Sequence, residues 1–264
     1  ERAMRSMYLS LCSFCMAMLQ CHGFSEPSTS TTTSTRHTRI DAFGTPREIQ
    51  VKQISHAPPM FVLQNFVSSA ERLSLMWSAR NHPNNSHTYT KTSNRDRSLV
   101  SWMPHTDAVS KALASSASDL ILGGPGKVEE LQVVQYKPDG QFTLHHDEHD
   151  RFLTVLYYLN GVAGTWFPLA SGMKAQEDHS ILPQNEQEAI QRANSMEPGQ
   201  DGILVATGTG NTHHTSSVVP IQPGDALVFF NYLSPNAQDW QAIHAGLPAT
   251  EEKWIATHWF HEQK

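Results

Sequence analysis

Apolar residues at helical spacing mark two segments in the first half of the chain. Ser68 or Ser69 is the expected N-cap of the first helix. The apolar residues of that helix fall on one face: Leu73, Met76 and Trp77. In the second segment, residues 106–122, apolar residues recur at helical spacing until a glycine-rich turn stops the pattern. The pattern therefore predicts two helices before residue 123.

The remaining apolar segments are short and have the character of strands. Several are apolar on both faces, as in the core of a sandwich or barrel. They lie at 61–63, 131–136, 152–159, 166–167, 203–206, 226–230 and 254–260. Within the third of these, alternation puts Thr154, Leu156 and Tyr158 on the face opposite to Leu153 and Val155, and one face should look into the barrel.

This order of elements predicts an α+β, mainly β fold. We expect a double-stranded β-helix (jelly roll) with the N-terminal helices packed outside it. The domain is expected to span residues 58–264. Polar residues 169–220 interrupt the strands, and we interpret them as a surface insertion near the mouth of the site, with a helix-like patch at Asn185–Ala193.

Residues 1–23 are predicted to be a secretory signal peptide. Two arginines precede the apolar run Met7–Leu19, and Cys21 and Gly23 place small residues before a cleavage site. The run is short for a membrane span, so no stable span is expected. We therefore expect the secretory pathway or endoplasmic reticulum, with an organelle transit peptide or a short membrane anchor as the alternatives.

Residues 24–57 are rich in serine and threonine and are expected to form a disordered linker. The part Ser25–Arg39 also contains arginine and few acids, which is the feature that favours the transit-peptide alternative.

Composition limits the classes of function. The net charge is −6 and no basic cluster is present, so binding to nucleic acid is not expected. The chain has three cysteines, Cys12, Cys15 and Cys21, all at its start. A metal bound by the domain must therefore be held by imidazole and carboxylate groups.

The candidate chemistry lies in two segments that are distant in sequence. The first contains His145, Asp147 and the alternative pair His146 and Glu148; residues i and i+2 of a strand project to the same face, and we favour His145 with Asp147. The second contains His244, which would complete a set of two imidazoles and one carboxylate. Such a set, with its other positions open, is typical of non-haem Fe(II) oxygenases.

Other histidines and aromatic residues are given structural roles. Adjacent His213 and His214 point to opposite faces of an extended chain and would chelate poorly. Four aromatic residues are expected in the core: Phe229, Phe230, Trp254 and Trp259.

Six ordered motifs resemble the prolyl 4-hydroxylase branch of the 2-oxoglutarate/Fe(II) dioxygenases. The resemblance runs from about Phe61 to His261, with residues 169–220 as an insertion. The motifs are Phe61–Ser68, Glu130–Tyr136, Arg151–Asn160, Trp166–Pro168, Gly224–Phe230 and His244–Pro248. The Arg-Thr-Ser element of the family has Arg97-Ser98 as its nearest counterpart, and Gly164-Thr165 stands where the family usually has Gly-Gly-Glu-Thr.

The resemblance implies an enzyme and a set of site residues. His145, Asp147 and His244 would bind Fe(II), Lys253 would pair with the far carboxylate of 2-oxoglutarate, and Tyr136 and Thr154 would support it. The cosubstrates would be 2-oxoglutarate and O₂, with ascorbate as reductant and succinate and CO₂ as products. The implied substrate is peptidyl proline in a peptide or protein, including proline-rich ones. The alternatives are the same chemistry on another side chain, a free amino acid or a small metabolite, or a non-catalytic jelly-roll binding module.

Overall fold

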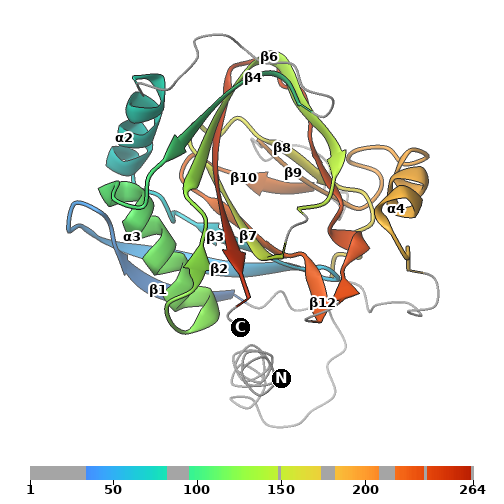
Figure 1. The fold of residues 1–264 in the computed structure, drawn as a ribbon, viewed down its shortest axis with the longest axis horizontal. Helices are drawn as coiled ribbons and strands as arrows, with labels where there is room; N and C mark the ends of the chain where they lie inside the picture. The colour runs from blue at the N-terminus through green and yellow to red at the C-terminus, as the bar shows by residue number, and fades with distance from the viewer. Residues whose placement is uncertain are drawn as a thin grey trace.

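One curled sheet forms most of the protein (Figure 1). The computed structural model describes residues 34–81, 95–147, 150–173, 182–207, 218–234 and 237–262. In this part of the chain the main sheet has 13 strands, in the order β1-β2-β3-β11-β7-β15-β6-β14-β8-β9-β10, with β4 paired to β6 and β5 to β15. All of these pairs are antiparallel except β9 with β10.

The strands of the main sheet are β1 (Ser34–Ile40), β2 (Pro46–His56), β3 (Pro59–Gln64), β4 (Arg95–Met103), β5 (Lys127–Val128), β6 (Leu131–His145), β7 (Arg151–Tyr158), β8 (Gly164–Phe167), β9 (Ile203–Thr207), β10 (Val218–Ile221), β11 (Ala226–Phe230), β14 (His244–Gly246) and β15 (Lys253–His261). A small second sheet pairs β12 (Tyr232–Ser234) with β13 (Ala237–Gln238). The helices are α2 (Ser69–Arg80), α3 (Ala108–Ala117), the π-helical turn η1 (Ser118–Leu122), α4 (Glu186–Ala193) and the 3₁₀ turn η3 (Trp240–Ala242).

The jelly-roll-like, mainly β architecture agrees with the sequence prediction. In Figure 1 the sheet is strongly curled, α2 and α3 lie together outside it, and α4 lies on the opposite side. Each predicted strand from residue 61 onward has a counterpart, and the two faces of β7 separate as expected. Leu153, Val155 and Tyr157 join the core cluster that includes helix residues, whereas Leu156 and Tyr158 join the cluster inside the curl.

Helix α2 begins where the sequence predicted but buries a different face. Ser68 is the N-cap, and its hydroxyl accepts a hydrogen bond from the backbone N–H of Glu71. The buried residues are Glu71, Leu75 and Ala79, whereas Leu73 and Trp77 are 63% and 69% exposed. The predicted apolar face was therefore wrong for Leu73 and Trp77, while Met76 is partly buried and packs against the core.

The predicted disordered linker was also wrong for residues 34–57. Strands β1 and β2 form an antiparallel hairpin at the edge of the main sheet, and β2 pairs with β3. Arg39 of β1 makes two hydrogen bonds to the carboxylate of Glu71, at 2.6 and 2.8 Å, and both side chains are buried. Residues 1–33, which include the predicted signal peptide, lie outside the described residues.

The segment 169–220 is more than a surface excursion. Its patch at 185–193 is helical, as predicted. However, β9 pairs with β8 and β10 with β9, so the segment adds two strands to one end of the sheet. Apolar residues at alternate positions, Ile203 and Val205, are buried in the core and explain why this part is a strand. Within the described residues, no helix is long and apolar enough to cross a membrane.

The buried ion pair predicts a large effect of mutation in the hairpin. Arg39→Met should lower the free energy of unfolding by about 3–5 kcal/mol, because it leaves the Glu71 carboxylate buried without its partner. Burial by itself raises the pKa of Glu71, but Arg39 and the N–H of Ser68 lower it, so the carboxylate is ionised at neutral pH. Urea unfolding followed by circular dichroism measures the effect.

Arg36→Met is the matched control, since Arg36 lies on the same strand and pairs with Glu48 at 3.4 Å on the exposed surface. Its unfolding midpoint should stay close to that of the wild type. Equal destabilisation by the two substitutions would contradict the role given to Arg39.

Candidate functional site

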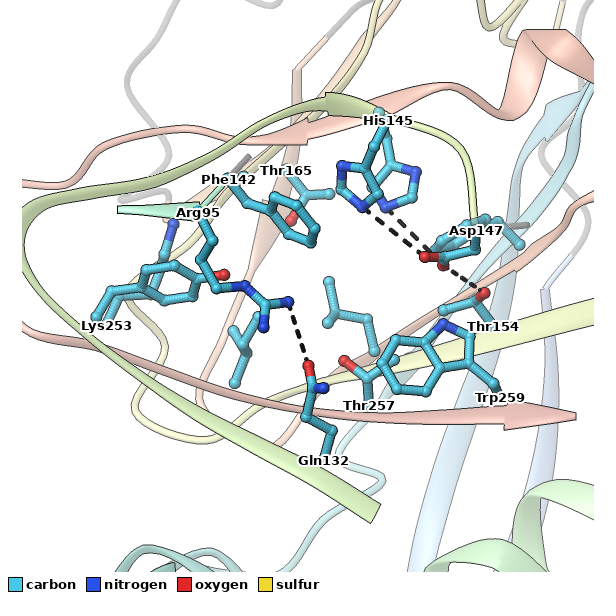
Figure 2. Close-up of a pocket in the computed structure, with 16 residues that line it drawn as sticks. Arg95, Gln132, Phe142, His145, Asp147, Thr154, Thr165, Lys253, Thr257 and Trp259 are labelled. Carbon is cyan, nitrogen blue, oxygen red and sulfur yellow. Dashed lines mark hydrogen bonds and ion pairs between the residues drawn. The ribbon is translucent and has the colours of Figure 1, made fainter. Parts of the chain in front are cut away.

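Three predicted ligands lie together at one end of a cavity inside the curled sheet (Figure 2). His145 ends β6, Asp147 follows two residues later, and His244 begins β14 directly opposite His145 in the strand pairing. Nε2 of His145 lies 3.8 Å from Oδ1 of Asp147, and Nε2 of His244 lies 4.0 Å from Oδ2. One ligand atom from each residue falls within 4.8 Å of the others, which is close enough for all three to bind one metal ion.

Hydrogen bonds to the backbone set the proton position on each imidazole. Nδ1 of His145 lies 2.8 Å from the carbonyl oxygen of Thr143, and Nδ1 of His244 lies 3.0 Å from that of Ala242. A carbonyl can only accept, so each Nδ1 carries a proton, and in the neutral form of the ring Nε2 keeps its lone pair. The protein thus offers both histidines in the form that binds metals.

Burial and neighbouring charge set the protonation states further. Burial, with help from His244, lowers the pKa of His145 to about 3, so the ring is neutral at physiological pH. Burial alone would raise the pKa of Asp147, but His244, His145 and the hydrogen bond from Thr154 lower it. Two imidazoles, of which that of His145 is neutral, and one ionised carboxylate fit a non-haem Fe(II) site.

The alternative register does not form this cluster. His146 is turned away, with Nε2 3.2 Å from the carbonyl oxygen of Asp239 and its ring 4.9 Å from that of Trp240. Glu148, His213 and His214 lie outside the described residues. The arrangement of the described side chains therefore favours His145 with Asp147.

Aromatic rings hold the two imidazoles in place. The Phe142 ring stacks on His145 at 3.7 Å between centroids, and the Phe167 ring stacks on His244 at 5.1 Å. Phe229 meets His244 edge-on at 4.9 Å. Phe229 was predicted to be a core residue only, but its ring also lines the cavity.

Lys253 lies in the wall of the same cavity, away from the metal ligands (Figure 2). It begins β15, opposite Tyr136 of β6, and its Nζ lies 4.7 Å from the centre of the Tyr136 ring. The ammonium donates a hydrogen bond to the carbonyl oxygen of Leu247 at 2.6 Å. No ion pair joins it to a carboxylate among the described residues, and burial lowers its pKa to about 8. A buried cation of this kind fits an anionic ligand.

Thr154 has a different place from the one implied by the resemblance. Its hydroxyl donates to Oδ2 of Asp147 at 2.8 Å, at the metal end of the cavity, whereas Lys253 lies at the other end (Figure 2). The threonine that lines the cavity from β8 is Thr165, whose hydroxyl accepts a hydrogen bond from Tyr158 at 2.9 Å.

Arg95 is a cavity residue that the sequence did not reveal. Its guanidinium lies 4.3 Å from the centre of the Phe142 ring and donates to Gln132 at 3.2 Å. Arg97, the residue suggested by the motif, is exposed and pairs with Asp139 at the surface.

Trp259, predicted as core, also lines the cavity. The full lining is Arg95, Gln132, Tyr136, Phe142, His145, Asp147, Thr154, Leu156, Thr165, Phe229, His244, Gly246, Lys253, Ile255, Thr257 and Trp259.

Comparison with known proteins gives consistent matches. Residues 131–261, which contain all three candidate ligands and Lys253, match the 2OG-Fe(II) oxygenase superfamily. The chain is 28% identical over 244 residues to prolyl 4-hydroxylase 2 of Arabidopsis thaliana, a match that covers 80% of this chain and 70% of the relative. It is 25% identical over 223 residues to a putative prolyl 4-hydroxylase of Acanthamoeba polyphaga mimivirus, covering 77% and 74%.

A solved structure supports the fold. A viral collagen prolyl hydroxylase from Paramecium Bursaria Chlorella virus-1, in complex with 2OG, superposes with a TM-score of 0.50 and 19% identity. The superposition covers 76% of this chain and 94% of the viral one. At this identity the likeness extends to the fold alone.

The geometry predicts which variants of the candidate ligands and their neighbours lose metal binding. His145→Ala, Asp147→Ala and His244→Ala should each lose binding of Co²⁺, because each removes a ligand atom, while the far-ultraviolet circular dichroism stays that of a folded protein. Visible absorption during a Co²⁺ titration measures the binding.

His146→Ala is the matched control and should keep Co²⁺ affinity within a fewfold of the wild type, since His146 faces Asp239 and Trp240. Loss of Co²⁺ binding in His146→Ala together with its retention in His145→Ala would show that the register is shifted by one residue.

Proposed function

We propose that this chain, which belongs to the 2OG-Fe(II) oxygenase superfamily, hydroxylates proline residues in a peptide or protein substrate. It uses Fe(II), 2-oxoglutarate and O₂ as an Fe(II)/2-oxoglutarate-dependent dioxygenase. One oxygen atom of O₂ goes to the hydroxylated product and the other to succinate, with release of CO₂. The proline substrate is supported by the names of the relatives, which are prolyl 4-hydroxylases.

The observation that carries the proposal is that one cavity joins two complementary sites. His145, Asp147 and His244 converge at one end, and Lys253 is buried at the other without a carboxylate partner in the described residues. 2-Oxoglutarate has a metal-chelating keto acid at one end and a free carboxylate at the other. The cavity therefore fits its chemistry at both ends.

The residues of this chain have separate tasks in that reaction. His145, Asp147 and His244 would hold Fe(II), which supplies the oxidation of an unactivated C–H bond once cosubstrate and O₂ are present. Lys253 would form a charge-assisted pair with the far carboxylate, beside the ring of Tyr136. The hydroxyl of Thr165, held by Tyr158, adds a polar group on the cavity wall. Leu156, Phe229 and Ile255 supply apolar walls that exclude water.

Two tryptophans support a peptide substrate that contains proline. Trp259 lines the cavity, and Trp102 lies beside it with 6.0 Å between ring centroids and 39% of its surface exposed. Arg151 lies 3.9 Å from the Trp259 ring and pairs with Glu129, which also accepts from His261. Flat aromatic faces next to fixed polar groups are the surfaces that bind extended proline-rich segments.

We further propose ascorbate as the reductant and the secretory pathway as the location. The first rests on the resemblance to the family, and the second on the apolar run Met7–Leu19. Sustained turnover that is independent of ascorbate would contradict the first. Failure of residues 1–23 to direct a reporter protein into the secretory pathway would contradict the second.

The direct test is succinate release with a panel of proline-containing peptides. Addition of one oxygen atom to proline, located by mass spectrometry, is the expected result. Free L-proline and peptides in which alanine replaces proline are the comparison arms. Succinate coupled to free L-proline or to another side chain would replace the peptidyl-proline assignment but leave the dioxygenase chemistry in place.

The buried ammonium of Lys253 leads to two predictions, one on the affinity for 2-oxoglutarate and one on how that affinity changes with pH. Lys253→Ala should weaken 2-oxoglutarate binding about ten- to hundredfold, because a charge-assisted pair is lost, and should affect peptide binding much less. Burial lowers the pKa of free Lys253 to about 8, and a bound carboxylate raises it again. Wild-type affinity should therefore be constant below pH 8 and fall by up to about tenfold per pH unit above it.

Lys253→Arg is the control for the titration, since a guanidinium keeps its charge over this range. Calorimetric titration of the Co²⁺-loaded protein from pH 6.5 to 9.5 measures both effects. A wild-type affinity that does not change above pH 8, or an equal loss of cosubstrate and peptide binding in Lys253→Ala, would make Lys253 a structural residue.

The position of Trp102 beside the cavity predicts that its side chain contributes to binding of the peptide substrate. Trp102→Ala should raise the KM for a proline-containing peptide about tenfold or more, as for the loss of an aromatic anchor, with the KM for 2-oxoglutarate unchanged. Trp77→Ala, which removes an exposed tryptophan from α2, should change neither constant. If the two substitutions have the same effect on the peptide KM, Trp102 is not part of the substrate surface.

A further inference from the structure

We propose that Asn231, acting through the hydroxyl of Thr154, holds the carboxylate of Asp147 in its metal-binding orientation. The three side chains form a chain of hydrogen bonds from Asn231 Nδ2 to Thr154 Oγ1 at 2.9 Å, and from Thr154 Oγ1 to Asp147 Oδ2 at 2.8 Å. The inference rests on the proposed role of Asp147 as a metal ligand. Asn231 and Thr154 are positioning residues in this scheme.

The chemistry of the partners fixes the direction of each hydrogen bond. The amide group of Asn231 also lies 3.0 Å from the carbonyl oxygen of Arg151, which can only accept. The atom that faces both partners is therefore the amide nitrogen, and its second hydrogen goes to Thr154 Oγ1. Because that oxygen accepts from Asn231, its own hydrogen is directed to the carboxylate of Asp147.

The hydrogen-bond chain to the carboxylate is buried throughout. Asn231 and Thr154 are 0% and 1% exposed, so solvent water does not compete for these groups. Asp147 lies just beyond the end of β6, where the strand pairing no longer holds the backbone. A carboxylate on such a connection needs side-chain contacts to fix its orientation, and outer contacts of this kind commonly tune metal affinity.

The scaffold that holds Asn231 is rigid. Asn231 follows β11, which pairs with β7 so that Phe230 lies opposite Leu153, next to Thr154. The backbone N–H of Asn231 donates to the carbonyl of Phe152 at 3.0 Å, and its carbonyl accepts from Asp239 at 2.9 Å. The neighbouring strands β7 and β11 thus position the hydroxyl that donates to Asp147.

Co²⁺ affinity of the full chain, measured by visible absorption, tests the proposal without reliance on turnover. Thr154→Val keeps the shape of the side chain but removes the hydroxyl, and should weaken Co²⁺ binding about 10- to 100-fold. Asn231→Ala should weaken it about tenfold. Thr154→Ser keeps the hydroxyl and should stay within about threefold of the wild type. Ser101→Ala removes a buried hydroxyl that donates to Ala79 away from the cavity, and should have no effect on affinity.

The double variant distinguishes positioning from a general structural role. Since Asn231 acts through Thr154, the variant with both Thr154→Val and Asn231→Ala should bind Co²⁺ within about twofold of Thr154→Val alone, whereas independent effects would multiply. Multiplied losses, or wild-type affinity in Thr154→Val, would overturn the proposal. Asp147→Ala tests the proposed metal site separately from the positioning role. If this variant keeps its Co²⁺ affinity, the proposed metal site itself is wrong.

Discussion

The site depends on the pairing of one long strand, β6, with two strands from the far end of the chain. β14 places His244 opposite His145, and β15 places Lys253 opposite Tyr136. Directly opposite residues in an antiparallel pair have Cβ atoms about 4.5–5.5 Å apart, so the sheet itself determines which side chains meet. A slip of one residue in either pairing would turn these side chains to the opposite face and dismantle the site.

Burial then determines the charge states of the side chains that the sheet brings together. The interior favours a neutral His145, and the hydrogen bond from Thr154 helps to keep Asp147 ionised. At the other end, burial lowers the pKa of Lys253, and a bound anion would stabilise its ammonium. The buried carboxylate of Asp147 therefore favours a divalent ion at one end of the cavity, and the buried ammonium of Lys253 favours a carboxylate at the other. This is the combination that a 2-oxoglutarate oxygenase requires.

The outer elements support this assembly by extending and covering the sheet. The hairpin of β1 and β2 continues the sheet on one side, and its Arg39 joins it to α2 through Glu71. On the other side, β9 and β10 continue it beyond β8, the strand that carries Thr165. Phe142 stacks on His145 of the same strand, β6, and Phe167 of β8 stacks on His244 of the neighbouring strand β14.

The sequence by itself determined the mainly β jelly-roll fold, most strand positions and the candidate ligands, because apolar periodicity and the His-x-Asp spacing are local signals. Tertiary structure alone decided the buried face of α2, which carries Glu71, and the order of residues 34–57, whose hairpin pairs with β3 and whose Arg39 pairs with Glu71. It also decided that Thr154 supports Asp147 and that Arg95, not Arg97, reaches the cavity. Such roles depend on which strands become neighbours in the curled sheet, and no local pattern encodes that.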